Sequence, residues 1–168
     1  SGSRNTGATN VARTCGTGPG LLTFGLDMAK GLVPMLLAMG WSTSAAFLTL
    51  TGLAALLGHM YSVFLNRKGG KGVATTIGLF LAVTPTPLFW AVVLCLIMIG
   101  VTKFVSIGSL TLVATLPVFM LIFGQFSYLI LSLIVLALVF SKHRENILRL
   151  IRGEEIPWKR SSFEAQAE

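Results

Sequence analysis

The sequence predicts an all-α protein, a polytopic bundle of membrane helices, and three observations support this fold class. The 168 residues are 54% hydrophobic and 11% charged, with a mean hydropathy of +0.80, whereas soluble domains carry about 25% charged residues. Apolar runs divide the chain into segments, and a helix needs roughly 20 such residues to cross a bilayer. The basic residues lie in alternate connections between these runs.

Six transmembrane or part-transmembrane helices are expected, at 20–38, 43–64, 73–84, 88–102, 105–123 and 126–141. The run 73–84 is too short for a full crossing, and Pro85 and Pro87 interrupt the chain after it. We therefore expect a half-inserted helix followed by one that begins near Pro87. The charge-free stretch 104–141 is too long for one helix, so a turn at Gly124 and Gln125 is expected to make a hairpin.

Charge predicts the orientation of the chain. The connections 39–43, 84–87 and 124–127 contain no lysine or arginine, whereas the connections between them do. By the positive-inside rule, the basic segments face the cytoplasm. A single membrane domain over 1–168 is therefore expected to have a cytoplasmic motif loop (1–19), a cytoplasmic glycine loop (66–72) and a cytoplasmic tail (142–168). We expect the tail to extend the last helix along the headgroups. The net charge of +7 does not indicate nucleic-acid binding, because the cations lie between hydrophobic spans.

The first polar cluster is GSRNTGATNVAR (2–13). Its glycines and small polar residues leave backbone N–H groups free for an anion, and Arg4 and Arg13 supply positive charge. Asn5, Thr9 and Asn10 are further candidate pocket residues. The alternative is an ordinary juxtamembrane loop.

The second cluster is RKGGKG (67–72). Its glycines allow a ligand to approach the backbone closely, and a helix beginning at Val73 would favour an anion at its N-terminus. The cluster is not a Walker A loop, because Gly72 follows Lys71 where that motif has serine or threonine. It is either a phosphate cradle or a basic turn that only sets topology.

The third cluster is KHRENILR (142–149), where His143 and Asn146 would share a helix face that Arg149 continues. A solvated helix end is the alternative. His59 could be a buried structural residue or a functional one. Asp27 and Lys30 lie inside the first apolar run, where they are expected either to pair with each other or to line a polar pocket.

These clusters predict a cytoplasm-facing pocket that is rich in phosphate-binding groups and poor in carboxylates. No metal-ligand set, Ser-His-Asp arrangement or CxxC motif is apparent in the sequence, so we expect neither a metal nor a cofactor. This composition favours a reaction without a covalent enzyme intermediate, in which a substrate supplies the attacking group.

Three motifs in order, GSRNTGATNVAR, GHMYSVFLNRKGGKGVAT and KHRENILRLIRGEE, make nearly the whole chain resemble the bacterial acyl-phosphate:glycerol-3-phosphate acyltransferases. The resemblance implies a multi-pass inner-membrane enzyme with its active site facing the cytoplasm. It would transfer a fatty acyl group from acyl phosphate to the 1-hydroxyl of sn-glycerol 3-phosphate, giving lysophosphatidic acid and phosphate. The implied partners are these two substrates, membrane lipid and, as a candidate, the enzyme that makes acyl phosphate.

The resemblance also implies roles for individual residues. The implied glycerol 3-phosphate ligands are Ser3, Arg13, Lys71, His143 and Asn146, and of these Ser3, His143 and Asn146 would be catalytic. The implied acyl-phosphate loop is Gly69, Gly70, Lys71 and Gly72, with Thr75 nearby. The proton of the attacking hydroxyl would pass either to His143 or to the acyl phosphate.

Two departures from the family pattern stand out. Arg4 occupies a position where the family usually has glycine. The family's first transmembrane helix would precede Ser1, so seven helices are expected in a protein that includes it, and that helix would form one wall of the acyl groove.

Two other kinds of protein share some of these features. A small phosphate or organic-anion transporter could also use glycine loops and half-length helices at membrane depth. It would need a polar path to the far side, yet the outer half of each predicted span is nearly free of charge. A structural subunit with a basic face for anionic lipid would leave the two glycine-rich loops unexplained.

Overall fold

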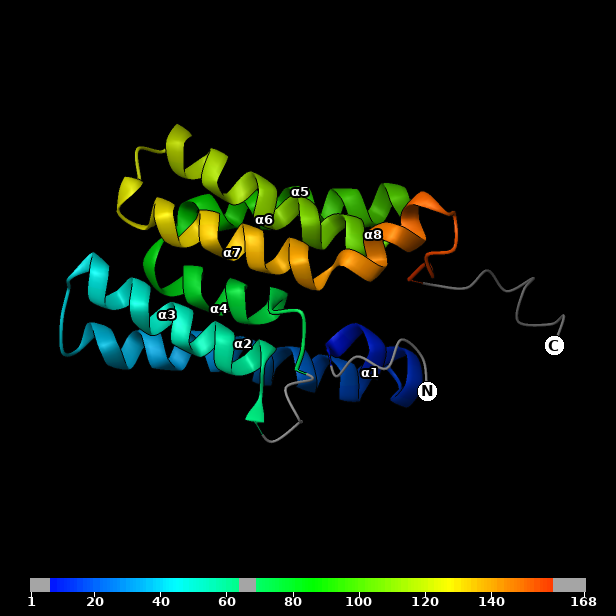
Figure 1. The fold of residues 1–168 in the computed structure, drawn as a ribbon, viewed down its shortest axis with the longest axis horizontal. Helices are drawn as coiled ribbons and strands as arrows, with labels where there is room; N and C mark the ends of the chain where they lie inside the picture. Colours follow the sequence, from blue (N-terminus) through cyan, green and yellow to red (C-terminus); the bar gives the residue numbers. More distant parts are fainter. Residues whose placement is uncertain (1–6, 64–68, 159–168) are drawn as a thin grey trace, which may run out of the picture.

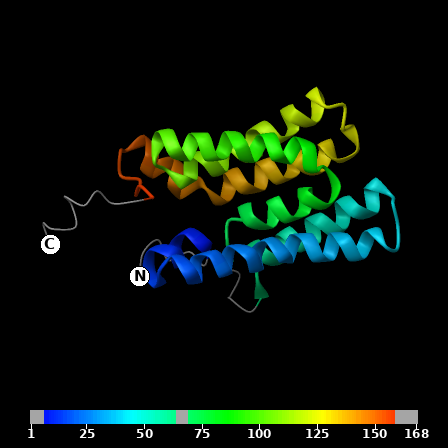
Figure 2. The same cartoon turned by 180° about the vertical axis from the view of Figure 1, so that it is seen from behind.

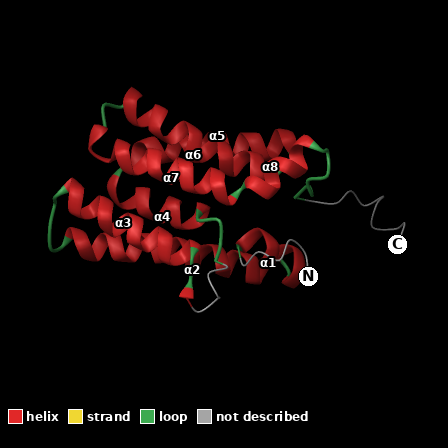
Figure 3. Cartoon of the chain, viewed as in Figure 1, coloured by secondary structure: helices red, strands yellow, loops and turns green. Residues whose placement is uncertain are grey.

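The computed structural model describes residues 7–63 and 69–158, and every regular element in these two ranges is a helix (Figure 3). Six apolar helices confirm the predicted bundle, and two short helices flank it. The elements are α1 (Ala8–Cys15), α2 (Thr17–Met39), α3 (Ala45–Met60), α4 (Val73–Val83), α5 (Pro85–Thr102), α6 (Val105–Ile122), the 3-10 turn η2 (Phe126–Tyr128), α7 (Leu129–Lys142) and α8 (Arg144–Ile151). Ser3, Arg4 and Asn5 lie outside the described residues.

Three helices, α2, α5 and α6, are long and apolar enough to cross a membrane, and the bent pair formed by 126–142 and α8 counts as a fourth if it is one span. Helix α3 is shorter than the predicted run 43–64, because Tyr61 leaves the helical conformation with φ −126° and ψ 43°. Helix α4 has 11 residues. At 1.5 Å per residue it covers about 16 Å, roughly half the hydrocarbon core, as expected for a half-inserted helix.

The turns follow from local backbone chemistry. Helix α5 begins at Pro85, two residues earlier than expected, because proline is tolerated at the first helical position. Gly124, with φ 67°, lies in the turn between α6 and α7, which form the predicted hairpin.

The two segments that we expected to face the cytoplasm differ from the predicted local structure. Helix α1 occupies part of the stretch 1–19 that we expected to be a loop, and it ends at Gly16, whose φ of 98° suits glycine. It packs closely on α2, since a Cβ added at Gly20 would lie 2.4 Å from the Cβ of Ala12. The tail is not a straight extension of the last helix, because α8 is bent by 59° away from α7, with His143 between them.

The backbones of α2 and α4 are in direct contact. A Cβ added at Gly31 would lie 2.2 Å from the carbonyl oxygen of Thr75, and one added at Gly78 would lie 2.0 Å from that of Met28. The Thr75 hydroxyl also donates a hydrogen bond to the backbone oxygen of Asp27, at 3.0 Å. This contact places the start of α4 beside the middle of α2 (Figures 1 and 2).

Helix α4 contributes to a core shared by most of the bundle. Leu79 and Phe80 are fully buried with Met35 of α2, Leu56 of α3 and Leu131 of α7. Figure 1 shows α1, α8 and the segment leading into α4 toward one end of the bundle, whereas the α2–α3 and α6–α7 connections lie at the other end. The fold therefore gathers the described parts of the three sequence motifs on one side.

We expect Gly31→Ala to destabilise the protein by about 1–3 kcal/mol, because the new methyl group would separate α2 from α4. Gly25→Ala is the matched control on the same helix, since a Cβ there meets nothing within 4 Å. The Gly25→Ala substitution should leave the melting temperature unchanged or raise it, because alanine has a higher helix propensity than glycine. Circular dichroism of both variants in detergent provides the measurement. Equal melting temperatures would contradict the close packing.

Candidate active site

A cavity of about 120 Å³ opens where α1, α2, α3, α4, α6 and α8 meet the tail after α8. The described residues implied for glycerol 3-phosphate binding, which are Arg13, Lys71, His143 and Asn146, all line it. The fold thus brings together residues that lie up to 133 positions apart (146 minus 13). The polar lining also includes Thr9, Asn10, Asp27, His59, Ser109, Arg149 and Glu155.

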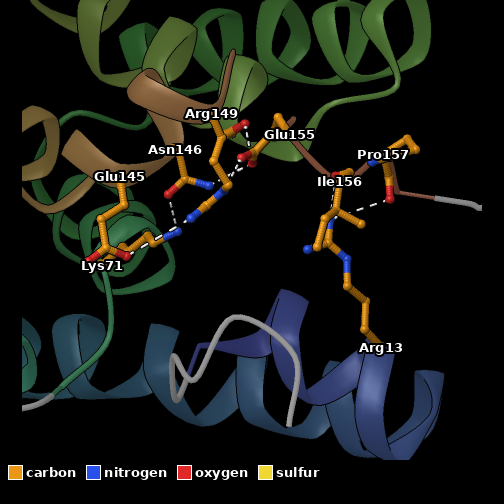
Figure 4. A network of polar contacts seen from close by, with 9 residues as sticks. Arg13, Lys71, Glu145, Asn146, Arg149, Glu155, Ile156 and Pro157 are labelled. Atoms are coloured by element: carbon orange, nitrogen blue, oxygen red, sulfur yellow. Dashed lines mark hydrogen bonds and ion pairs between the residues drawn. The ribbon is translucent and has the colours of Figure 1, made fainter. Parts of the chain in front are cut away.

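Lys71 connects the glycine loop to α8. Its ammonium group donates a hydrogen bond to Oδ1 of Asn146 (Figure 4). Burial lowers the pKa of Lys71 to about 8, the charge of Glu155 opposes this shift, and Arg149 adds to it. The ammonium is therefore mainly protonated at neutral pH, but it loses its charge at only moderately basic pH.

Glu155 holds the cavity wall in place. Its carboxylate accepts hydrogen bonds from Ser106 Oγ at 2.9 Å, Asn146 Nδ2 at 2.6 Å and Arg149 Nε at 2.8 Å. Burial by itself raises the pKa of Glu155, but these hydrogen bonds and the charge of Arg149 outweigh burial and lower the pKa overall, so the group is ionised. The amide nitrogen of Asn146 is thereby held toward Glu155 and its oxygen toward Lys71 (Figure 4).

Glu155 was not among the predicted site residues, and the only sequence signal for it is the GEE that closes the third motif. The pocket also contains a second carboxylate, Asp27, which was among the candidate pocket residues. Each carboxylate has its own cation, Arg149 for Glu155 and Lys30 for Asp27. The pairs leave Arg13 and Lys71 as the cations that face the cavity without an ion pair to a described residue.

His143 lies between α7 and α8 and is 2% exposed. Its Nδ1 is 2.8 Å from the carbonyl oxygen of Val139. Because a carbonyl can only accept, Nδ1 carries the proton and Nε2 is the acceptor of the neutral ring. Burial, followed by the charge of Lys71, lowers the pKa of His143 to about 4, so the ring is neutral at pH 7.

Arg13 joins α1 to the tail. Its guanidinium donates hydrogen bonds to the carbonyl oxygens of Ile156 and Pro157, at 2.8 Å and 3.4 Å (Figure 4). Its Nε is buried without a hydrogen-bond partner among the residues that the structure describes. A buried donor without a partner lowers the stability of the fold. This N–H is therefore suited to donate a hydrogen bond to an oxygen of a bound ligand.

The described residues of the glycine loop, 69–72, are divided between this cavity and a second one. Lys71 and Gly72 line it, whereas Gly69 and Gly70 border a neighbouring cavity of about 490 Å³. Thr75 lines neither cavity, because it is fully buried and its hydroxyl bonds to Asp27 on α2.

Asp27 and Lys30 form the ion pair that was one of the two expectations, at 2.8 Å. Asp27 also lines the cavity, in agreement with the second expectation, whereas the Lys30 side chain is 58% exposed and borders only the neighbouring cavity. His59 is buried and lies 3.5 Å from Asp27, measured from Nδ1 to Oδ1. Both Asp27 and His59 line both cavities, so they stand between them.

Comparison with known proteins places this site in a family. Residues 1–153 match the sequence model described as glycerol-3-phosphate acyltransferase. Relatives with that name include a protein of Nitratidesulfovibrio vulgaris, 52% identical over 98% of this chain and 50% of its own length. Another, from Solidesulfovibrio magneticus, is 51% identical over 98% of this chain and 82% of its own length. The chain therefore spans half of the first relative and about four fifths of the second.

Two solved structures have the same fold. One is the glycerol 3-phosphate form of PlsY (YgiH), an integral membrane glycerol 3-phosphate acyltransferase, with a TM-score of 0.91 and 38% identity over 99% of this chain and 84% of that one. The other is a lysophosphatidic acid form of the same enzyme, with a TM-score of 0.88 and 40% identity over 92% of this chain and 80% of that one. On the sequence match and on this shared helical architecture, the chain belongs to the glycerol-3-phosphate acyltransferase family.

Proposed function

We propose that the protein transfers a fatty acyl group from acyl phosphate to the 1-hydroxyl of sn-glycerol 3-phosphate at the cytoplasmic face of the bacterial inner membrane. The observation that carries this proposal is the convergence of Arg13, Lys71, His143 and Asn146 on one cavity in a member of this family. The two solved relatives are titled for the acceptor, glycerol 3-phosphate, and for the product, lysophosphatidic acid. Family membership also argues against the transporter and structural-subunit alternatives.

The acceptor half of the cavity provides charge and orientation. The Lys71 ammonium and the unpaired Nε of Arg13 are suited to the phosphate of glycerol 3-phosphate. Nε2 of His143 can accept a hydrogen bond from a hydroxyl, and the Asn146 amide can orient a second one. Ser3 remains a predicted contributor, outside the described residues.

The donor half is suited to a phosphate joined to an apolar chain. Gly72 precedes α4, whose N-terminal amides favour an anion. Val73 lines the cavity, and Ile77 and Leu81 follow it at four-residue intervals on one face of the helix. Those two residues border an apolar groove of about 530 Å³ with Phe89 of α5. The groove supports a path for the acyl chain away from the glycine loop.

The donor is already activated, so no acyl-enzyme is required. The acceptor hydroxyl attacks the carbonyl carbon, a carbon–oxygen bond forms, and the bond to phosphate breaks with its electron pair on the leaving phosphate. A histidine with a pKa near 4 is a weak base at neutral pH, so the proton passes to the leaving phosphate. His143 then acts by accepting a hydrogen bond from the hydroxyl and aiming it.

The reaction is tested with the purified product of the complete gene, acyl phosphate and glycerol 3-phosphate, by measuring released phosphate and lysophosphatidate. We expect Lys71→Ala to lower kcat/KM for glycerol 3-phosphate by about 10–100-fold, because a charge-assisted contact is lost. Lys103→Ala is the control, since its ammonium bonds to the backbone of Gly100 at the end of α5. The absence of product with the wild-type protein would exclude the proposed function.

We expect kcat/KM for glycerol 3-phosphate to fall as the pH rises through about 8, because Lys71 loses its proton there and no longer attracts phosphate. Lys71→Arg should abolish this decline up to pH 9.5 even if its activity is lower, because a guanidinium stays protonated. Initial rates from pH 6.5 to 9.5 provide the profile. A wild-type profile that is flat across this range would contradict the role of Lys71.

We expect His143→Ala to reduce kcat by less than tenfold and to raise KM for glycerol 3-phosphate by tenfold or more. The reason is that a neutral, hydrogen-bonded imidazole positions the hydroxyl without removing its proton. Steady-state kinetics with each substrate varied in turn separates the two constants. A loss of more than a hundredfold in kcat at unchanged KM would identify His143 as a general base instead.

A further inference from the structure

The proposed reaction leaves one buried polar pair of the cavity without a role, His59 and Asp27. His59 belongs to the last turn of α3, and its side chain is 7% exposed. The glycine loop lies directly against it. A Cβ added at Gly70 would lie 2.3 Å from Nε2 of His59, and one added at Gly69 would lie 1.9 Å from the His59 carbonyl oxygen. The loop therefore needs glycine at these positions because the histidine occupies the space beneath it.

Asp27 helps to orient the imidazole ring of His59. Its Oδ1 lies 3.5 Å from Nδ1 of His59, so the Nδ1 edge of the imidazole ring is beside a carboxylate, and Nε2 is beside the loop. Asp27 is itself held by Lys30 at 2.8 Å, and the Thr75 hydroxyl bonds to its backbone oxygen. The pair is thus anchored to α2 and α4, the two helices that position the loop.

The chemistry of the pair needs an explanation. A buried carboxylate repels a phosphate ligand unless cations offset its charge. Asp27 is paired with Lys30, and its Oδ1 also faces His59, which could carry a second positive charge. Two lysines act on His59 through their charges, Lys30 on α2 and Lys142 on α7, which bonds to the Met60 carbonyl oxygen. Lys71 of the loop lines the same cavity. A phosphate at the loop would offset these charges. An imidazolium between that phosphate and Asp27 would then be stabilised from both sides.

From this geometry we propose that His59, aligned by Asp27, is a ligand of the donor phosphate. On binding, His59 takes up one proton from solvent, keeps Nδ1–H toward Asp27, and donates a hydrogen bond from Nε2 to a phosphoryl oxygen at the glycine loop. The inference rests on the proposed function and assigns different residues to the two substrates. His143 and Asn146 bind and orient the acceptor, whereas His59, oriented by Asp27, binds the leaving phosphate.

A purely structural role for His59, as a brace under the loop, makes a different prediction. Lys71 belongs to the same loop and is proposed to bind glycerol 3-phosphate. A displaced loop would therefore weaken the binding of both substrates. Loss of a direct contact from His59 would weaken only the binding of acyl phosphate.

The test compares His59→Phe, His59→Gln and Asp27→Asn with the control Gly58→Ala, which adds a methyl group where nothing lies within 4 Å. We expect His59→Phe and Asp27→Asn to raise KM for acyl phosphate at least tenfold, while KM for glycerol 3-phosphate changes less than threefold. His59→Gln keeps an N–H donor and should recover part of the loss. Gly58→Ala should behave as the wild type.

Thermal shifts with inorganic phosphate alone give a second measurement that does not need turnover. We expect phosphate to stabilise the wild type and Gly58→Ala, and to stabilise Asp27→Asn much less. Parallel increases in both KM values, or failure of both His59→Phe and Asp27→Asn to fold, would overturn the proposal in favour of a brace. A wild type that binds phosphate in this way but forms no lysophosphatidate would count against the proposed function and not against the anion contact.

Discussion

The rest of this structure depends on the direct contact between the backbones of α2 and α4. At Gly31 and Gly78 the two helices approach so closely that a single methyl group would not fit. Because α4 is only half as long as a membrane span, this contact places its first residues, and residues 69–72 before them, inside the protein. Irregular backbone at such a depth is tolerated only where it is buried or lines a cavity. The arrangement lets the proposed phosphate site and an apolar groove share one short helix.

The cavity contains two carboxylates, which would repel an anionic ligand, and each is paired with a cation of the protein. Glu155 is ionised, yet its charge is taken up by Arg149 and by hydrogen bonds from Ser106 and Asn146. The same hydrogen bonds set the direction of the Asn146 amide, so a negative group contributes order to an anion site without opposing it. The tail that carries Glu155 is also held by Arg13, through two backbone carbonyls. The wall of the cavity is therefore assembled from both ends of the chain.

The neutral state of His143 agrees with the activated donor that we propose for this protein. An acyl phosphate brings its own leaving group, so the protein has to bind, orient and stabilise charge more than it has to move protons. Burial and the charge of Lys71 lower the pKa of His143 and keep the imidazole neutral, and the Val139 carbonyl determines which ring nitrogen accepts. His59 has a carboxylate neighbour where His143 has a carbonyl. The two histidines of this chain thus have partners that differ in charge, a neutral carbonyl and a carboxylate, which is the physical basis for proposing different roles.

The sequence by itself determined the number of apolar helices, the half-length of α4 and the hairpin at Gly124, because these follow from the local free energy of burying each segment and from glycine and proline geometry. The family was also predictable from the motifs, and so were four residues that line the cavity, Arg13, Lys71, His143 and Asn146. Only the tertiary structure decided the helical form of 8–15, the bend at His143, the burial of Thr75 and the inclusion of Glu155. These features arise from contacts between segments that are distant in the chain, such as Arg13 with Ile156, and residue patterns within one segment do not encode such contacts.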